Sequence, residues 1–183
     1  AADRFTITIQ GKGGHGASPQ ETIDPIAVGA QIISALQTIV SREVDPIEPA
    51  VVTVGALHAG DAANVIPDTA ELRGTLRSFN PEVREQLKVR VGEVARGVAE
   101  AMRAQADYVF SPGYPSTVND PAMADLVLEV AEGVVGEENV ILQALKMGAE
   151  DFSYFLEKVP GAFWFVGSRN AEKGLVWGHH HPR

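Results

Sequence analysis

A glycine-rich segment with a single histidine is the part of this sequence best suited to chemistry. It runs from Gly11 to Pro19 and follows an alternating apolar run, Phe5 to Ile9, that predicts a strand. Glycines permit positive φ and a close approach of the backbone to a ligand. His15 is the residue of this segment that can exchange a proton or polarise a carbonyl near neutral pH. The segment predicts a loop that presents an imidazole to a ligand, with a plain surface turn as the alternative.

The glycine spacing also matches a nucleotide-binding fingerprint. The pattern Gly11-x-Gly-x-x-Gly16 after a strand is typical of dinucleotide-binding loops, which open directly into a helix. Here Ser18-Pro19 intervenes, and the first helix signal comes only at Asp24-Pro25. The Gly-Lys-Ser/Thr ending of a phosphate-binding loop is also missing. Nucleotide binding is therefore disfavoured.

Three further groups of residues are candidates for binding. His179-His-His-Pro182 follows the apolar run 162–166, and three imidazoles there indicate metal binding, with solvated histidines as the alternative. The carboxylates of Glu150 and Asp151 stand at the start of a predicted helix, where plain capping is the simpler interpretation. Arg77 lies on the polar face of a predicted strand and can grip a carboxylate with two hydrogen bonds, although arginines on wet sheet faces are usually only solvated.

Composition restricts the class of protein. The 183 residues are 45% hydrophobic and 21% charged, as in a globular protein with one large or two small domains. A net charge of -9 argues against a nucleic-acid partner, and no apolar run approaches the roughly 18 residues of a membrane span. Cysteine is absent, which fits a reducing, cytoplasmic environment. Because the chain begins without Met and stops just after the histidines, we expect it to be part of something longer.

The elements that must position these residues follow a recognisable order through residue 113. Apolar periodicity and capping residues predict strand, helix, strand, strand, helix and strand at residues 5–9, 25–42, 50–57, 70–79, 81–104 and 107–110. This order is that of the split βαβ, ferredoxin-like fold, an antiparallel sheet with both helices on one face. Asn64 falls in the turn between the middle strands and on its own is simply a turn residue.

The first predicted helix has an unusual surface. No charged residue occurs between Pro25 and Ser41, and apolar side chains cover more than one of its faces. A helix of this kind has two surfaces to bury, of which one is its own sheet. The other is predicted to contact a second subunit, with burial inside a single larger fold as the alternative.

The residues from 114 onward predict a smaller set of elements. A helix runs from Pro121 to Gly136, short strands are expected at residues 139–142 and 162–166, and a short helix follows Asp151. About 70 residues are few for an independent domain, so these elements are expected to belong to a larger α/β sheet. The chain is thus predicted to divide into segments 1–113 and 114–183.

Seven segments taken together resemble the M20 family of metal-dependent amidohydrolases. The resemblance is to the branch of hippurate hydrolase, N-acyl-amino-acid amidohydrolases, auxin-conjugate hydrolases and related carboxypeptidases. The segments, in family order, are Gly11–Pro19, Asp24–Ile26, Val52–Gly55, Asn64–Asp68, Gly74–Phe79, Met147–Phe155 and His180–Pro182. The resemblance implies an α/β fold in which a ferredoxin-like lid (residues 1–113) forms a homodimer. It further implies that residues 114–183 are the C-terminal piece of a catalytic domain that holds two divalent metals, such as Zn, Mn, Ni or Co.

The same resemblance implies roles for individual residues. His15 matches a lid histidine that reaches the partner subunit's metal site and stabilises the oxyanion of the reaction. Asn64 and Arg77 match residues that hold the substrate's carboxylate or carbonyl group. Gly148 and Glu150 match residues beside the cleft. His180 matches the family's last metal ligand.

The implied activity is hydrolysis of the amide bond of N-acyl amino acids or related peptides by a water activated by two metals. The family's early His-x-Asp motif does not occur in this sequence. This motif and the family's paired glutamates, which supply most ligands and the general base, are expected to lie before Ala1. The chain alone is therefore predicted to be inactive. The alternative function is a non-catalytic, ferredoxin-like dimerisation module.

Overall fold

The computed structural model describes residues 1–174, 176 and 177, and these form two compact units. The first unit consists of Ala1–Thr117 together with Leu142–Phe155, and the second of Val118–Ile141 and the residues from Leu156 onward. In the described residues no helix is long and apolar enough to cross a membrane. The division into a lid of residues 1–113 and a catalytic segment of residues 114–183 stays a prediction.

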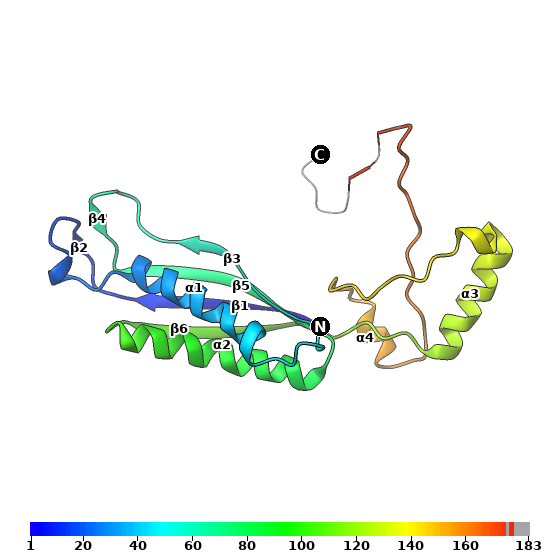
Figure 1. The fold of residues 1–183 in the computed structure, drawn as a ribbon, viewed down its shortest axis with the longest axis horizontal. Coiled ribbons are helices and arrows are strands. Elements are labelled where there is room, and N and C mark those ends of the chain that lie inside the picture. Colours follow the sequence, from blue (N-terminus) through cyan, green and yellow to red (C-terminus); the bar gives the residue numbers. More distant parts are fainter. Residues whose placement is uncertain (175, 178–183) are drawn as a thin grey trace. The chain divides into compact units, whose positions relative to one another are not determined.

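A four-stranded antiparallel sheet is the centre of the first unit (Figure 1). Its order is β3-β5-β1-β6, and its strands are β1 (Ala2–Gln10), β3 (Ala50–His58), β5 (Thr69–Ser78) and β6 (Gln105–Tyr114). Helices α1 (Pro25–Arg42) and α2 (Pro81–Ala101) pack side by side against one face. This arrangement confirms the predicted mixed α/β, ferredoxin-like fold.

The alternation of apolar and polar side chains along the strands decides which face of the sheet is buried. Ala70, Leu72 and Leu76 of β5 face the helices, and Gly74 between them lies under the ring of Phe5. A Cβ at Gly74 would stand 2.2 Å from Cζ of that ring, so only glycine fits there. The core is completed from both helices, and its largest fully buried side chains include Phe5, Ile7, Ile9, Ile32, Leu36, Ile39, Leu72, Leu76, Leu87 and Val91.

A buried ion pair ties three elements of the first unit together. The Asp3 carboxylate in β1, in a residue only 2% exposed, accepts hydrogen bonds from Nε and Nη2 of Arg84 in α2 at 2.8 and 2.6 Å. It also accepts one from the backbone N–H of Gly113 in β6 at 2.9 Å. Burial raises the pKa of Asp3, but the hydrogen bonds from Arg84 and Gly113 outweigh burial and hold the pKa below its ordinary value.

Strand β6 is longer than predicted. It continues through Pro112 to Tyr114, beyond the end that the sequence predicted at Phe110. Proline is tolerated because β6 is an edge strand, on which one set of N–H groups has no partner to bond. The pairing with β1 shifts register between Ala2 and Arg4, opposite this proline, as expected at a bulge.

The second unit contains helix α3 (Pro121–Val135) and the 3₁₀ turn η2 (Glu137–Asn139). The predictions of strands at residues 139–142 and 162–166 were wrong, because neither segment pairs with another strand. A strand needs a neighbour for its N–H and C=O groups, and here the Asn119 side chain exchanges hydrogen bonds with the backbone of Phe163 instead. The segment 162–166 is also not buried, since Val166 is 84% exposed.

Four short elements remain. They are β2 (Gly14–His15), β4 (Val65–Ile66), the 3₁₀ turn η1 (Pro19–Glu21) and the single-turn helix α4 (Ser153–Leu156). Helices α1, α2 and α3 begin where the sequence predicted, each with a side-chain cap from Asp24, Asn80 or Asp120 followed by proline. Helix α4 is the short helix predicted to follow Asp151, and it spans a single turn of 4 residues.

Candidate functional site

The glycine-rich segment is not a free loop, because it pairs with the connection between β3 and β5. Gly14 and His15 form the short strand β2, which is antiparallel to Val65 and Ile66 of β4. Gly16 N–H donates to the carbonyl oxygen of Asn64 at 2.8 Å and extends the ladder by one bond. This pairing brings His15 and Asn64, two residues that the sequence separates by 49 positions, to the same place in the fold.

The glycines serve this pairing and not a strained backbone. None of the four has a positive φ, contrary to the sequence interpretation; they are Gly11, Gly13, Gly14 and Gly16. A Cβ at Gly13 would lie 2.7 Å from the carbonyl oxygen of Ile66, and one at Gly11 would lie 2.3 Å from that of Ile23. Glycine is therefore needed because two backbones approach each other too closely for any side chain.

His15 projects from this ladder into solvent, as does Asn64. Its ring is held locally, since the backbone N–H of Ala17 donates to Nδ1 at 3.0 Å. The backbone carbonyl of His15 accepts from Ser18 N–H at 2.9 Å, which closes the turn that follows. The second ring nitrogen, Nε2, has no such bond among the described residues and is available to a ligand.

Arg77 lies near the end of β5, on the face of the sheet opposite the helices. Its Nη1 donates to the backbone carbonyl oxygen of Met147 at 2.7 Å, a contact that sequence reasoning missed. Met147 directly precedes Gly148, and Glu150 follows two residues later, so the structure brings Arg77 together with the segment that holds these two predicted residues. The remaining donors of the guanidinium group can still serve a ligand.

Gly148 and Glu150 lie in an irregular stretch before α4. Gly148 is exposed and a Cβ there would meet no atom within 4 Å, so packing in this chain does not require glycine. The carbonyl oxygen of Glu150 accepts from the Ser153 backbone N–H at 3.2 Å and hydroxyl at 2.6 Å, which makes the turn into α4. In the described part of the chain no hydrogen bond reaches the Glu150 carboxylate, which leaves it open to an external group.

These residues form two groups at opposite ends of the sheet. Gln10, the last residue of β1 before the glycine-rich segment, pairs with Thr69, whereas Ala2 pairs with Arg77. Eight residue steps of β5 separate Thr69 from Arg77, a length of about 26 Å at about 3.3 Å per residue. Figure 1 shows β2 and β4 at one end of the sheet and the N-terminus at the other. Within one chain, His15 and Arg77 cannot contact the same small molecule.

A family model described as the peptidase dimerisation domain, M20_dimer, matches residues 2–103, which is more than half of the chain. This chain belongs to the M20 peptidase family. The matched residues include β1 to α2, so the M20 model covers the glycine-rich segment, His15, Asn64 and Arg77 but stops before β6.

The relatives described here have the names of hydrolases. Thermostable carboxypeptidase 1 of Saccharolobus solfataricus is 38% identical over 97% of this chain and 45% of its own length. N-acetyl-L-cysteine deacetylase of Bacillus subtilis is 42% identical over 100% of this chain and 42% of its own. The structure of B. subtilis YxeP, described as a dinuclear metal binding peptidase from the M20 family, is 36% identical with a TM-score of 0.68 and covers 89% of this chain and 40% of that one. The chain spans less than half the length of these relatives.

The described residues do not form a metal centre of the kind that the M20 family implies. No group of three or more His, Asp or Glu side chains among them could hold a metal ion. His180, the predicted metal ligand, lies outside the described residues. Because the donor set does not fit a dinuclear centre, we assign no chemical step of this chain to a metal.

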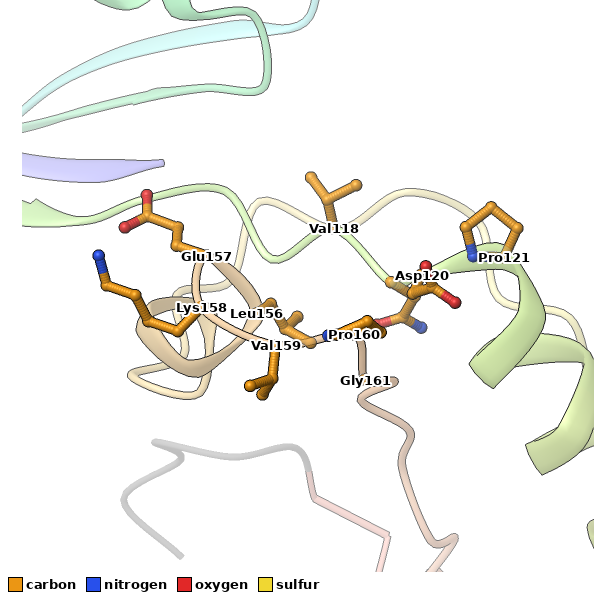
Figure 2. Close-up of a pocket in the computed structure, with 10 residues that line it drawn as sticks. Val118, Asp120, Pro121, Leu156, Glu157, Lys158, Val159, Pro160 and Gly161 are labelled. Atoms are coloured by element: carbon orange, nitrogen blue, oxygen red, sulfur yellow. The ribbon is translucent and has the colours of Figure 1, made fainter.

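The second unit contains a shallow groove of about 470 Å³ that has a different lining (Figure 2). Its walls come from residues 118–121 and 156–161, and none of the sequence-predicted site residues is among them. In Figure 2, Glu157 and Lys158 extend from the side of the groove away from Asp120 and Pro121. The carboxylate of Asp120 is already used to cap α3, by accepting from Met123 N–H at 3.1 Å. This groove therefore has no set of converging reactive groups.

Proposed function

We propose that this chain provides the lid and the C-terminal catalytic segment of an amidohydrolase that cleaves the amide bond of an N-acyl amino acid or a short peptide. Its M20 membership supports hydrolysis, and the named relatives that act on N-acetylcysteine or as carboxypeptidases support this substrate class. Because the chain spans less than half of their length, activity would require the rest of such an enzyme, which would also supply the metal ligands.

The observation that carries the proposal is the separation of the predicted site residues into two groups. His15 and Asn64 sit together at one end of the sheet, and Arg77 with the Gly148–Glu150 segment sits at the other, about 26 Å away. One substrate can meet both groups only if they come from different subunits. We therefore assign His15 and Asn64 to the active site of the partner subunit and Arg77 to the site of its own subunit.

The residue types suit these tasks. When water adds to the amide carbonyl carbon, its oxygen becomes an oxyanion, and the ring N–H of His15 can donate a hydrogen bond to it. The guanidinium of Arg77 has donors left over from its bond to Met147, and they suit the carboxylate of an amino-acid product. These two residues thus orient the substrate and stabilise the developing charge, while the C–N bond breaks and the amine leaves with a proton.

Two surfaces of the first unit support a homodimer. The outward face of α1 is exposed and uncharged, whereas that of α2 is charged; the α1 residues are Ala27, Ala30, Ser34, Gln37 and Ser41. Edge strand β3 is the partner of β5 on the α1 side of the sheet, and unlike edge strand β6 it contains no proline. We propose that α1 and the edge of β3 meet their counterparts in a second copy.

Subunit complementation tests this assignment. In the full-length enzyme, His15→Ala and Arg77→Ala should each abolish hydrolysis of N-acetyl amino acids. After subunit exchange in an equal mixture, half of the dimers are mixed, and each mixed dimer has one site with both residues intact. About a quarter of the wild-type activity should return. Mixed dimers that form and stay inactive would refute the assignment to separate subunits.

The chain by itself is expected to show no hydrolysis of N-benzoylglycine with added Mn²⁺ or Zn²⁺. Turnover that is lost in His180→Ala would contradict this expectation and would mean that the chain holds a working metal site. If the full-length variants His15→Ala and Arg77→Ala both keep full activity while the protein is dimeric, the chain is a non-catalytic dimerisation module.

A further inference from the structure

The ring of His15 is bonded in a way that decides which nitrogen carries its proton. A neutral imidazole has one N–H and one bare nitrogen. Nδ1 accepts a hydrogen bond from the backbone N–H of Ala17 at 3.0 Å, so Nδ1 must be the bare nitrogen. The proton of neutral His15 is therefore on Nε2, the ring atom that the described residues leave open to a ligand.

The donor of this bond is fixed by the backbone around it. On one side, Gly16 N–H is bonded to the Asn64 carbonyl at 2.8 Å, and on the other, Ser18 N–H is bonded to the His15 carbonyl at 2.9 Å. Ala17 N–H lies between these two bonded amides and has the imidazole as its acceptor. The orientation of the ring thus follows from the β2–β4 ladder and the turn after it, and no side chain of the described residues is hydrogen-bonded to the ring.

We propose that the backbone amide of Ala17 is a positioning group that holds His15 in the Nε2–H tautomer. Neutral His15 can then donate a hydrogen bond through Nε2 but cannot accept a proton there. The amide of Ala17 thereby assigns His15 to stabilising an oxyanion and excludes it from acting as a general base through Nε2. The tautomer is a property of this chain, and only its use in catalysis rests on the proposed function.

Nitrogen NMR of the ¹⁵N-labelled chain tests the inference directly. At about pH 9, where histidines are neutral, His15 should show a bare-type Nδ1 and a protonated Nε2, with a scalar coupling across the hydrogen bond from Ala17 N to Nδ1. His58 is the internal reference, because it is exposed and among the described residues no hydrogen bond to its ring is found. His58 should show both tautomers.

Two variants distinguish the effect of the backbone N–H of Ala17 from the effect of its side chain. Ala17→Gly keeps the N–H and should keep the tautomer and the coupling. Ala17→Pro removes the N–H and should give His15 the mixed tautomers of His58, while the core methyl signals of the first unit stay in place. Mixed tautomers or an Nδ1–H form in the unmodified chain would overturn the inference, and that measurement does not depend on how Ala17→Pro folds.

The activity of the full-length enzyme addresses the proposed function separately. If His15→Ala keeps its kcat while the NMR of the unmodified chain shows the Nε2–H tautomer, the oxyanion role of His15 fails while the positioning role of Ala17 stands. If the unmodified chain lacks the Nε2–H tautomer, the inference fails whatever the activity is.

Discussion

The guanidinium group of Arg77 donates from Nη1 to the backbone carbonyl oxygen of Met147 at 2.7 Å. This bond attaches the segment Leu142–Phe155 to the sheet of the first unit, although the two residues are far apart in sequence. The hydroxyl of Tyr154 makes a second, longer attachment by donating to the carbonyl of Gly113 at 3.3 Å. Arg77 therefore has a structural partner in this chain as well as the substrate role proposed for it.

Replacing Arg77 by Met should loosen the attached segment without unfolding the sheet. A hydrogen bond from a charged group contributes about 1.5–3 kcal/mol, so the amides of residues 147–153 should exchange with solvent at least about 10-fold faster. Hydrogen exchange with mass spectrometry measures this change. Arg73→Met is the matched control, because Arg73 is on the same strand and face but, within the described part of the chain, is bonded only to the nearby Glu71. Equal exchange in the two variants would mean that the Arg77 bond does not hold the segment.

The ion pair between Asp3 and Arg84 should make the first unit sensitive to acid. The pKa of Asp3 is below its ordinary value of 3.8 in the folded state, so its contribution is complete above about pH 5 and is lost as pH falls through the folded pKa. Asp3→Asn should lower the free energy of unfolding at pH 7 by about 2–3 kcal/mol and should flatten its dependence on pH below 4. Amide exchange of the core between pH 3 and 7 gives both quantities.

Replacing Arg84, the partner of Asp3 in this ion pair, provides a sharper test. Arg84→Met leaves a carboxylate buried with only the Gly113 N–H as partner, and should cost about 3–5 kcal/mol at pH 7. Burial of Asp3 is then opposed only by the Gly113 hydrogen bond and the Ala1 ammonium group, so the pKa of Asp3 should rise and the gain of stability between pH 4 and 7 should shrink or reverse. The exposed pair Lys88–Glu85 is the control, and Lys88→Met should leave the pH dependence unchanged. The same pH slope in Arg84→Met as in the unmodified chain would contradict the account.

Gly13 and Gly97 should respond in opposite ways to the same substitution. At Gly13 a new Cβ meets backbone atoms of β4, and separating the two strands should cost about 1–3 kcal/mol locally and disturb the NMR signals of His15. At Gly97, on the exposed side of α2, a Cβ meets nothing within 4 Å, so alanine should stabilise the helix by about 0.5–1 kcal/mol. Urea unfolding and the His15 ring signals compare the two variants. Undisturbed His15 signals in Gly13→Ala would show that the close contact is not what requires glycine.

The sequence predicts those parts of the structure that depend on interactions between residues close together in the chain, and misses those that depend on contacts between distant segments. Alternation in β5 and the Asp24, Asn80 and Asp120 caps are local signals, and the strands and helices that they predicted are in place. The two-residue ladder of β2 and β4 has no periodicity to detect, so the partner of the glycine-rich segment was missed. The strand predicted at residues 162–166 failed because an apolar run becomes a strand only beside another strand.

The candidate site shows the same limit. Residue types identified His15 and Arg77 as candidates, because imidazole and guanidinium groups suit a polar ligand, whereas Asn64 became a candidate only through the resemblance to the M20 family. Their distribution over two ends of one sheet depends on strand order and register, which no local pattern contains. The bond from Arg77 to Met147 likewise joins distant segments through a backbone carbonyl that every residue type carries.

The proposed dimer surface can be tested with two charges placed on α1. Ala30 and Ser34 lie one turn apart on its exposed, uncharged face, and glutamate at both positions should bring like charges together across a twofold axis. Sedimentation velocity should then show monomers where the unmodified chain forms dimers. These positions are better suited than Ile33, which packs partly against the core, so that a charge there would also disturb folding.

The control for this experiment adds the same charge to the other helix. Val89→Glu with Gly97→Glu places two carboxylates on the exposed side of α2, where Val89 is 45% exposed and a Cβ at Gly97 meets nothing within 4 Å. This variant should remain dimeric, which separates a specific contact of α1 from a general effect of added negative charge. Dimers that persist in Ala30→Glu/Ser34→Glu would exclude α1 from the interface, and dissociation of both variants would trace the effect to net charge alone.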